Sequence, residues 1–285
     1  MNDKLKFGNG NAKLAQGIGT FSLPAGHSCP YARECLSKSN RLTGKLIDGK
    51  HCKFRCFAAS QEMIFPNVRK ARWYNFDLLR AEGTEEKMGK LIQRSLPWGI
   101  NIIRTHVSGD YYNPRYFFAW LNVALNNPHI IFYGYTKATP LLVEYKKYLP
   151  SNFRFTASKG GTCDNLIAKH HLKSAEVVFS VEEAKRKGLE IDHDDNHAIG
   201  GKKSFALLLH GMQAAGTEAA AALVALKREG IGGYGEASKA KLKEQFERAF
   251  VMHFELKNGE VFKSQTNFPM AFMPKYDGIR EIYKH

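Results

Sequence analysis

Hydrophobic runs alternate with amphipathic segments along the middle of the chain, between residues 100 and 212. Short runs rich in Ile, Val, Phe and Leu are typical of buried strands, and capped or amphipathic segments between them are typical of helices. The predicted strands are "TFSL" (20–23), "INIIRTHVSGD" (100–110), "HIIFYGYTKA" (129–138), "NFRFTAS" (152–158), "SAEVVFSV" (174–181) and "KSFALLLHG" (203–211). This alternation predicts an α/β fold with parallel strands, arranged as a (βα) partial barrel or as a doubly wound open sheet.

Helix signals flank and separate these strands. Asn113 followed by Pro114 predicts a capped helix start, and Thr139 followed by Pro140 repeats the pattern. Pro66 divides the segment 58–81 into two helices, and Thr84 caps the next one.

The pattern changes after residue 212. An Ala-rich segment (214–230) and a charged amphipathic one (236–250) read as helical, and residues 251–265 read as a hairpin turning at Asn258-Gly259. We therefore expect two units: a βα barrel domain containing the cysteine loop (1–212) and a C-terminal helical and hairpin subdomain (213–285).

The charge of the chain favours polyanionic partners. Its 285 residues include 42 basic and 27 acidic side chains, which gives a net charge of +15. Such an excess favours nucleic acid or nucleotides as partners. No apolar run is long enough to cross a bilayer, and the N-terminus lacks a signal-peptide core. We expect a cytoplasmic protein without a membrane partner.

Four of the five cysteines lie within 28 residues of one another. Cys29, Cys35, Cys52 and Cys56 are separated by 5, 16 and 3 residues. Four thiolates can hold a structural zinc, although the spacing is looser than in zinc ribbons, and they can also hold an iron–sulfur cluster. Disulfides are disfavoured in the cytosol. Cys163 lies apart and is expected to be an ordinary semi-buried thiol.

The cysteine loop follows the first predicted strand, at the end of the sheet where βα folds place their ligands. Polar residues follow the other strands as well. We expect one site formed by this loop and the polar strand ends, with "SGD" capping the next helix as the alternative for residues 108–110. The strand-end candidates are Ser108, Gly109, Asp110, Thr136, Lys137 and Ser158.

Other clusters have competing interpretations. Asp192, His193, Asp194, Asp195 and His197 form either a solvated acidic loop or a divalent-metal site of nuclease type.

Residues 69–74 combine Arg69, Lys70 and Arg72 with Trp73 and Tyr74, as in nucleic-acid binding. The alternative is a helix with its aromatics in the core and its basic residues in solvent. His106 is expected to be a satisfied core histidine.

Two resemblances add to this interpretation. "NAKLAQGIGTFSLPAGHSCP", "CFAASQEMIFPNVRKARWYN", "HVSGDYYNPRYFFAW", "FYGYTKATPLL" and "ASKGGTCDNLI" resemble the bacteriophage gene product 88 family over about residues 9–212. The order of cysteine loop, "SGD", "YTK" and "AS" is similar, at the level of fold, to the radical S-adenosylmethionine barrel.

The second resemblance implies a 4Fe-4S cluster with S-adenosylmethionine. Cys29, Cys35 and Cys56 would hold the cluster, and Cys52 would be a fourth ligand or a bystander. Ser108, Gly109 and Asp110, with Thr136 and Ser158, would contact the cofactor, while Asp110 and Lys137 would be catalytic. The gaps of 5 and 20 residues between the three cysteines depart from the C-x3-C-x2-C pattern of that superfamily.

The leading hypothesis is a phage-type iron–sulfur enzyme that modifies nucleic acid or a nucleotide. The alternatives are a non-catalytic, zinc-stabilised nucleic-acid-binding protein and a divalent-metal-dependent nuclease centred on residues 192–197.

Overall fold

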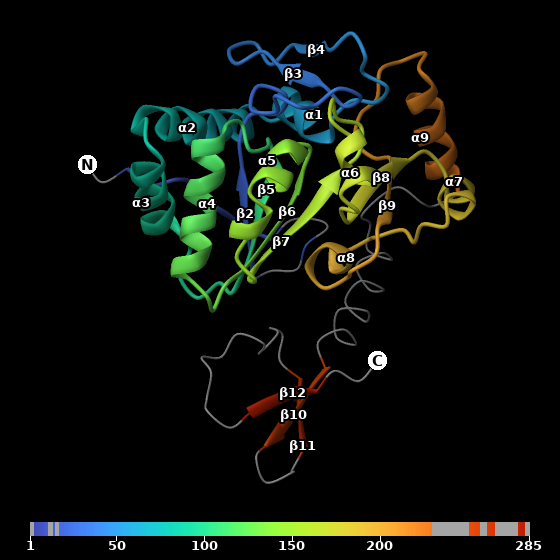
Figure 1. Ribbon diagram of the computed structural model, residues 1–285. Coiled ribbons are helices and arrows are strands. Elements are labelled where there is room, and N and C mark those ends of the chain that lie inside the picture. The colour runs from blue at the N-terminus through green and yellow to red at the C-terminus, as the bar shows by residue number, and fades with distance from the viewer. Residues whose placement is uncertain are drawn as a thin grey trace.

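The computed structural model describes residues 3–10, 14, 17–229, 251–256, 261–265 and 279–282 (Figure 1). Its main feature is a seven-stranded sheet in the order β1-β2-β5-β6-β7-β8-β9. The strands are β1 (Gly8–Asn9), β2 (Ile18–Ser22), β5 (Ile102–Ser108), β6 (Ile131–Thr136), β7 (Phe153–Ser158), β8 (Ser174–Val178) and β9 (Phe205–Leu208).

The sheet is parallel from β2 to β9, and only β1 is antiparallel to its neighbour β2. The predicted mostly parallel α/β fold is therefore confirmed. From β2 onwards the strands follow one another in chain order, without the reversal that defines a doubly wound sheet. Among the described strands, β1 and β9 are the two edges, and no pairing joins them into a closed barrel.

The helices form where the sequence places caps and prolines. Asn113 Oδ1 accepts a hydrogen bond from the Tyr116 amide at 2.8 Å, and Thr84 caps its helix in the same way. The start predicted at Thr139 is wrong in detail, because its helix has no side-chain cap. The helices are α1 (Phe57–Ile64), α2 (Pro66–Glu82), α3 (Glu85–Ser95), α4 (Pro114–Asn126), α5 (Thr139–Glu144), η1 (Lys146–Tyr148), α6 (Asn165–Lys169), α7 (Val181–Arg186), α8 (Asn196–Ile199) and α9 (Glu218–Arg228).

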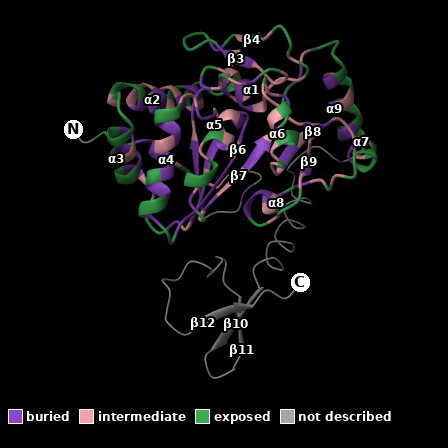
Figure 2. Cartoon of the chain, viewed as in Figure 1, coloured by how far each residue is buried: buried purple, intermediate pink, exposed green. Residues whose placement is uncertain are grey.

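Both faces of the sheet are covered, so its strands are apolar on both sides (Figure 2). The larger core lies between the sheet and helices α2 to α5, around Phe21, Trp120 and Phe132. A smaller cluster lies on the opposite face, where α8 packs with Ile199 against Ile102 and Phe205.

The segment 27–56, which we call the cysteine insert, lies over the carboxyl end of the sheet (Figure 1). It contains a two-stranded antiparallel ladder of β3 (Ser37–Ser39) and β4 (Leu46–Asp48), and it leads into α1.

Beyond the predicted boundary at residue 212, α9 packs with Leu223 and Leu226 against Leu209, directly after β9. The predicted hairpin is confirmed, since β10 (Val251–Leu256) pairs with β11 (Val261–Gln265) and also with β12 (Ile279–Ile282). The predicted helix 236–250 and the turn at Asn258-Gly259 lie outside the described residues.

Candidate functional site

Three thiols and the ends of three strands line one cavity of about 170 Å³ at the carboxyl end of the sheet. Cys29, Cys35 and Cys56 come from the cysteine insert, and the predicted strand-end residues come from β5, β6 and β7. The apolar part of the lining comes from the insert, α1, β8 and β9. The polar lining includes Ser108, Gly109, Asp110, Thr136, Lys137 and Ser158, and the apolar lining includes Phe54, Phe57, Val177, Leu207 and Leu209.

The three thiols influence one another electrostatically. Burial raises the pKa of Cys29 well above its ordinary value, and the charges of Asp110, Cys56 and Cys35 raise it further. Burial also raises the pKa of Cys35, opposed mainly by the Lys137 ammonium, and raises the pKa of Cys56 to about 11. These thiols are therefore protonated at neutral pH, and a bound metal centre would be needed to ionise them.

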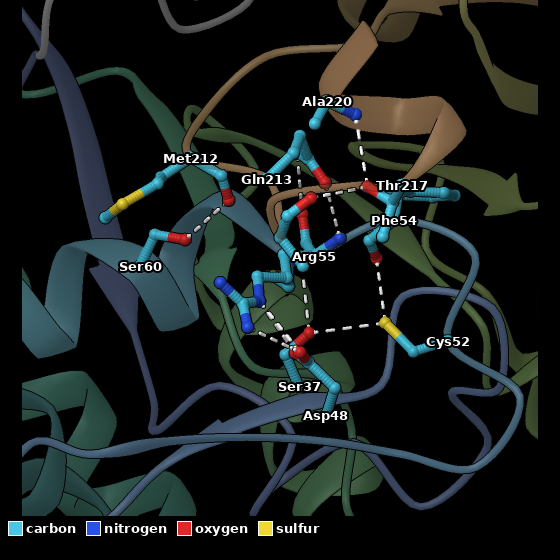
Figure 3. A network of polar contacts seen from close by, with 12 residues as sticks. Ser37, Asp48, Cys52, Phe54, Arg55, Ser60, Met212, Gln213, Thr217 and Ala220 are labelled. Carbon is cyan, nitrogen blue, oxygen red and sulfur yellow. Dashed lines mark hydrogen bonds and ion pairs between the residues drawn. The ribbon is translucent and has the colours of Figure 1, made fainter.

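The fourth cysteine of the insert is engaged elsewhere. Cys52 Sγ donates to the Phe54 carbonyl at 3.1 Å and lies 3.6 Å from Ser37 Oγ (Figure 3). It is absent from the cavity lining, as is Cys163, whose sulfur lies 3.7 Å from Thr162 Oγ1. Cys52 thus does not line the cavity that the other three thiols share, although the charge of Cys35 raises its pKa.

Ser108 and Gly109 fix the end of β5 to the start of the cysteine insert. Ser108 Oγ donates to the Leu23 carbonyl at 2.8 Å, and the Leu23 amide donates back to Ser108 at the same distance. Gly109 has a φ of +85°, and a Cβ there would lie 2.5 Å from Ser28 Oγ. Only glycine suits this contact, which holds the backbone just before Cys29.

Asp110 joins the ends of β5 and β6. Its carboxylate accepts from the Tyr111 amide at 2.8 Å, the Thr136 hydroxyl at 2.5 Å and the Lys137 amide at 2.8 Å. Burial raises the pKa of Asp110, while these hydrogen bonds act in the opposite direction. A carboxylate has about four acceptor positions, so one remains for a ligand.

Lys137 joins the ends of β6 and β7. Its ammonium donates to Ser158 Oγ at 2.8 Å and to the carbonyls of Ser158 and Lys159. All three acceptors are neutral, and the side chain is buried beside the cavity. A cation held in this way favours negative charge in the cavity.

The interpretation of residues 192–197 as a solvated acidic loop is wrong, and the divalent-metal interpretation stays a prediction. Asp192, Asp194 and Asp195 are buried, so the segment is not a solvated loop. Asp195 pairs with Arg104 at 2.7 Å and accepts from the hydroxyls of Tyr133 and Tyr135. In the described ranges, no group of three or more His, Cys, Asp or Glu side chains is arranged to hold a single metal ion.

The predicted solvent exposure of Arg69 and Arg72 in α2 is wrong. Arg69 and Arg72 are buried rather than solvated or available to nucleic acid. Arg72 pairs with Glu62 at 2.9 Å, and Arg69 donates to the carbonyls of Glu62, Arg41 and Leu42.

His106 is only partly satisfied. Its Nε2 lies 2.9 Å from Tyr116 Oη, whereas Nδ1 has no partner within the described structure. Burial lowers the pKa of His106 to about 3, so the ring is neutral.

Sequence reasoning missed Arg104 and Arg55, which also line the cavity. Tyr135 and His210 belong to strand ends that the sequence already indicated as part of the site. The sequence did offer a signal for Arg104, which is an arginine within an otherwise apolar strand. Charged side chains are rarely buried without a partner, so its position indicated a specific contact inside the protein.

These features define a class: an α/β protein with a consecutive parallel sheet and a thiol-lined cavity at its carboxyl end. The chain belongs to the Gene product 88 family, whose model matches residues 2–227, and the predicted resemblance is thereby confirmed. The chain is 28% identical over 213 residues to the Gene 88 protein of Mycobacterium phage L5, an alignment covering 70% of this chain and 74% of that protein. No solved structure matches the chain. None of the described helices is long and apolar enough to span a membrane.

Proposed function

We propose that the protein is an iron–sulfur enzyme resembling the radical S-adenosylmethionine superfamily and acting on nucleic acid or a nucleotide. One observation carries the proposal: Cys29, Cys35 and Cys56 line one cavity with the polar ends of β5, β6 and β7. The consecutive parallel order from β2 to β9 supports it, because such sheets place ligands at their carboxyl ends.

The donor set favours a cluster over a single zinc ion. A tetrahedral zinc with Zn–S bonds of about 2.3 Å draws its sulfurs to within about 4 Å of one another. The described residues offer no such group of three. A cluster binds each thiolate at a separate iron, so its three sulfurs need not approach one another as closely as the sulfurs around a single zinc ion do.

Three thiolates would hold a 4Fe-4S cluster and leave one iron open. Such a cluster, once reduced by an external one-electron donor, would supply reductive cleavage of the sulfonium of S-adenosylmethionine. Asp110 has an acceptor position for an ammonium, and Lys137 supplies positive charge. Phe54, Phe57 and Leu209 supply part of the apolar lining around them.

The size of the cavity limits what enters it as it stands. A volume of about 170 Å³ suits a compact inorganic group. Drug-sized ligands occupy about 300–1,000 Å³, so S-adenosylmethionine requires the cysteine insert or a strand-end loop to move outwards.

The test is metal content after purification without oxygen. We expect brown protein with iron and acid-labile sulfide, absorbing near ~400 nm through thiolate-to-iron charge transfer. Cys29→Ser, Cys35→Ser and Cys56→Ser should each lose most of the iron. Cys52→Ser and Cys163→Ser are the matched controls and should retain it.

Colourless protein carrying about one zinc per chain would support the zinc-stabilised alternative instead. Equal iron loss in Cys52→Ser would contradict the assignment of three ligands.

A further inference from the structure

The cysteine insert carries a higher density of positive charge than the rest of the chain, and one of its faces is directed to solvent. Residues 27–56 contain seven Lys and Arg against two acidic residues, a net charge of +5. This tenth of the sequence therefore carries a third of the total of +15. The two acidic residues are already neutralised, since Glu34 pairs with Lys53 and Asp48 pairs with Arg55.

The remaining basic side chains project outwards. Lys38 lies opposite Ile47 in the β3–β4 ladder, and directly opposite residues share a face. Ser37 and Ser39, which flank Lys38, are buried, so the other face of β3 is directed inwards. Arg33, Lys45 and Lys50 are exposed. Within the described part of the chain, no ion pair engages these three or Lys38.

Apolar side chains lie among these cations. Leu42 at the turn of the ladder is 85% exposed, and Ile47 is 57% exposed. Arg41 lies 4.6 Å over the ring of Trp73 beside them. Exposed apolar groups between cations suit a partner that offers both phosphates and unstacked bases.

The surface is preformed. Arg69 of α2 donates to the carbonyls of Arg41 and Leu42, which fixes the turn of the ladder to a buried side chain of α2. Ser39 Oγ donates to the Gly44 carbonyl across the turn at 3.2 Å. Binding therefore does not require this segment to be ordered first.

We propose that the outer face of the cysteine insert, formed by Arg33, Lys38, Leu42, Lys45, Ile47 and Lys50, is a docking surface for single-stranded nucleic acid. The inner face of the same segment supplies Cys29, Cys35 and Cys56 to the cavity, so a docked strand lies against the element that covers the cavity. This inference rests on the proposal that the enzyme acts on nucleic acid. The docked single-stranded nucleic acid would be the substrate or would contain the nucleotide that reacts.

The experiment measures binding of a fluorescent single-stranded 20-mer to the full chain by anisotropy at several salt concentrations. The variant is Lys45→Gln/Lys50→Gln, and the matched control is Lys87→Gln/Lys146→Gln, which removes the same charge from exposed positions on α3 and η1. Each lost phosphate contact reduces the salt slope by about 0.7, so we expect a reduction of about 1.4 in the variant and none in the control. Leu42→Ser should weaken binding several-fold and leave the slope unchanged.

Equal losses in the variant and the control would overturn the proposal, as would equal affinity for a duplex of the same length. Binding to anionic lipid vesicles without binding to the oligonucleotide would also overturn it. Iron is measured in the same samples. Protein without iron that binds the strand through Lys45 and Lys50 contradicts the iron–sulfur assignment alone, and iron-loaded protein that does not bind contradicts the docking surface alone.

Discussion

At the scale of single residues, the site depends on a few side chains that join strand ends. Asp110 connects β5 to β6, Lys137 connects β6 to β7, and Ser108 connects β5 to the residues after β2. The bonds of Ser108 and Asp110 are buried and those of the Lys137 ammonium are partly buried, so each contributes to stability and also positions the cavity wall. Gly109 is strongly constrained, because both its conformation and its neighbours exclude a side chain.

We predict that Gly109→Ala lowers the free energy of unfolding by about 3 kcal/mol. The reason is left-handed backbone strain, about 1–2 kcal/mol, together with overpacking against Ser28 and Leu23. Gly83→Ala is the matched control, since Gly83 also has a positive φ but its Cβ would meet nothing within 4 Å. Urea unfolding measures both variants, and an equal loss in the two would show that the close contact at Gly109 costs nothing.

At the scale of elements, one buried ion pair holds α1, α2 and the end of β2 together. Glu62 of α1 is fully buried and accepts from the Ala25 amide at 2.8 Å as well as from Arg72 of α2. Arg72 also donates to the Ala58 carbonyl at 2.8 Å. The pair therefore sets the direction in which the chain leaves the cysteine insert.

Arg72→Met should lower the free energy of unfolding by about 3 kcal/mol, because it leaves the Glu62 carboxylate buried without its cation. The double variant Glu62→Gln/Arg72→Met removes both charges and should recover part of the loss. Urea unfolding of the wild type, the single variants and the double variant gives the coupling energy between the two side chains. Strict additivity would contradict the pairing.

At the scale of the whole molecule, residues 190–197 place charged groups on the face of the sheet that α8 covers. His197 contacts Asp192 and Glu190 at 2.9 Å, and these hydrogen bonds raise the pKa of His197 to about 9. Asp195 in the same segment binds Arg104 of β5. The protonation of this segment is therefore linked to the stability of the fold.

The sign of this linkage follows from the raised pKa. His197 has a folded pKa of about 9 against an ordinary value of 6.5. Its contribution is complete below pH 6.5 and is lost as the pH rises towards 9 and beyond. Because Glu190 is exposed, we expect the effect to be about 1 kcal/mol. The difference in unfolding free energy between the wild type and His197→Gln should shrink across that range, and a difference independent of pH would contradict the assignment.

Much of this arrangement was predictable from local pattern. A few consecutive residues are enough to predict apolar strands such as 131–136 and capped helices such as the one after Asn113. Because the strands are parallel, their polar ends then lie together at one edge of the sheet. The pairing of Arg104 with Asp195 was not predictable, because 91 residues separate the two and only the packing of the α8 segment against the sheet brings them into contact. Arg72 was misread for a related reason: its partner Glu62 lies beyond the break at Pro66, where helical periodicity carries no information.

The contact between Arg55 and Gln213 bears on the order of synthesis. The Arg55 amide donates to the side-chain oxygen of Gln213, and the Gln213 amide donates back to the Arg55 carbonyl, across 158 residues of chain. Leu207, Leu209 and His210 complete the same wall. While the ribosome is still making the second half of the protein, the three thiols have emerged but their enclosure has not. The wall around them is complete only once residues 207–210 have been made.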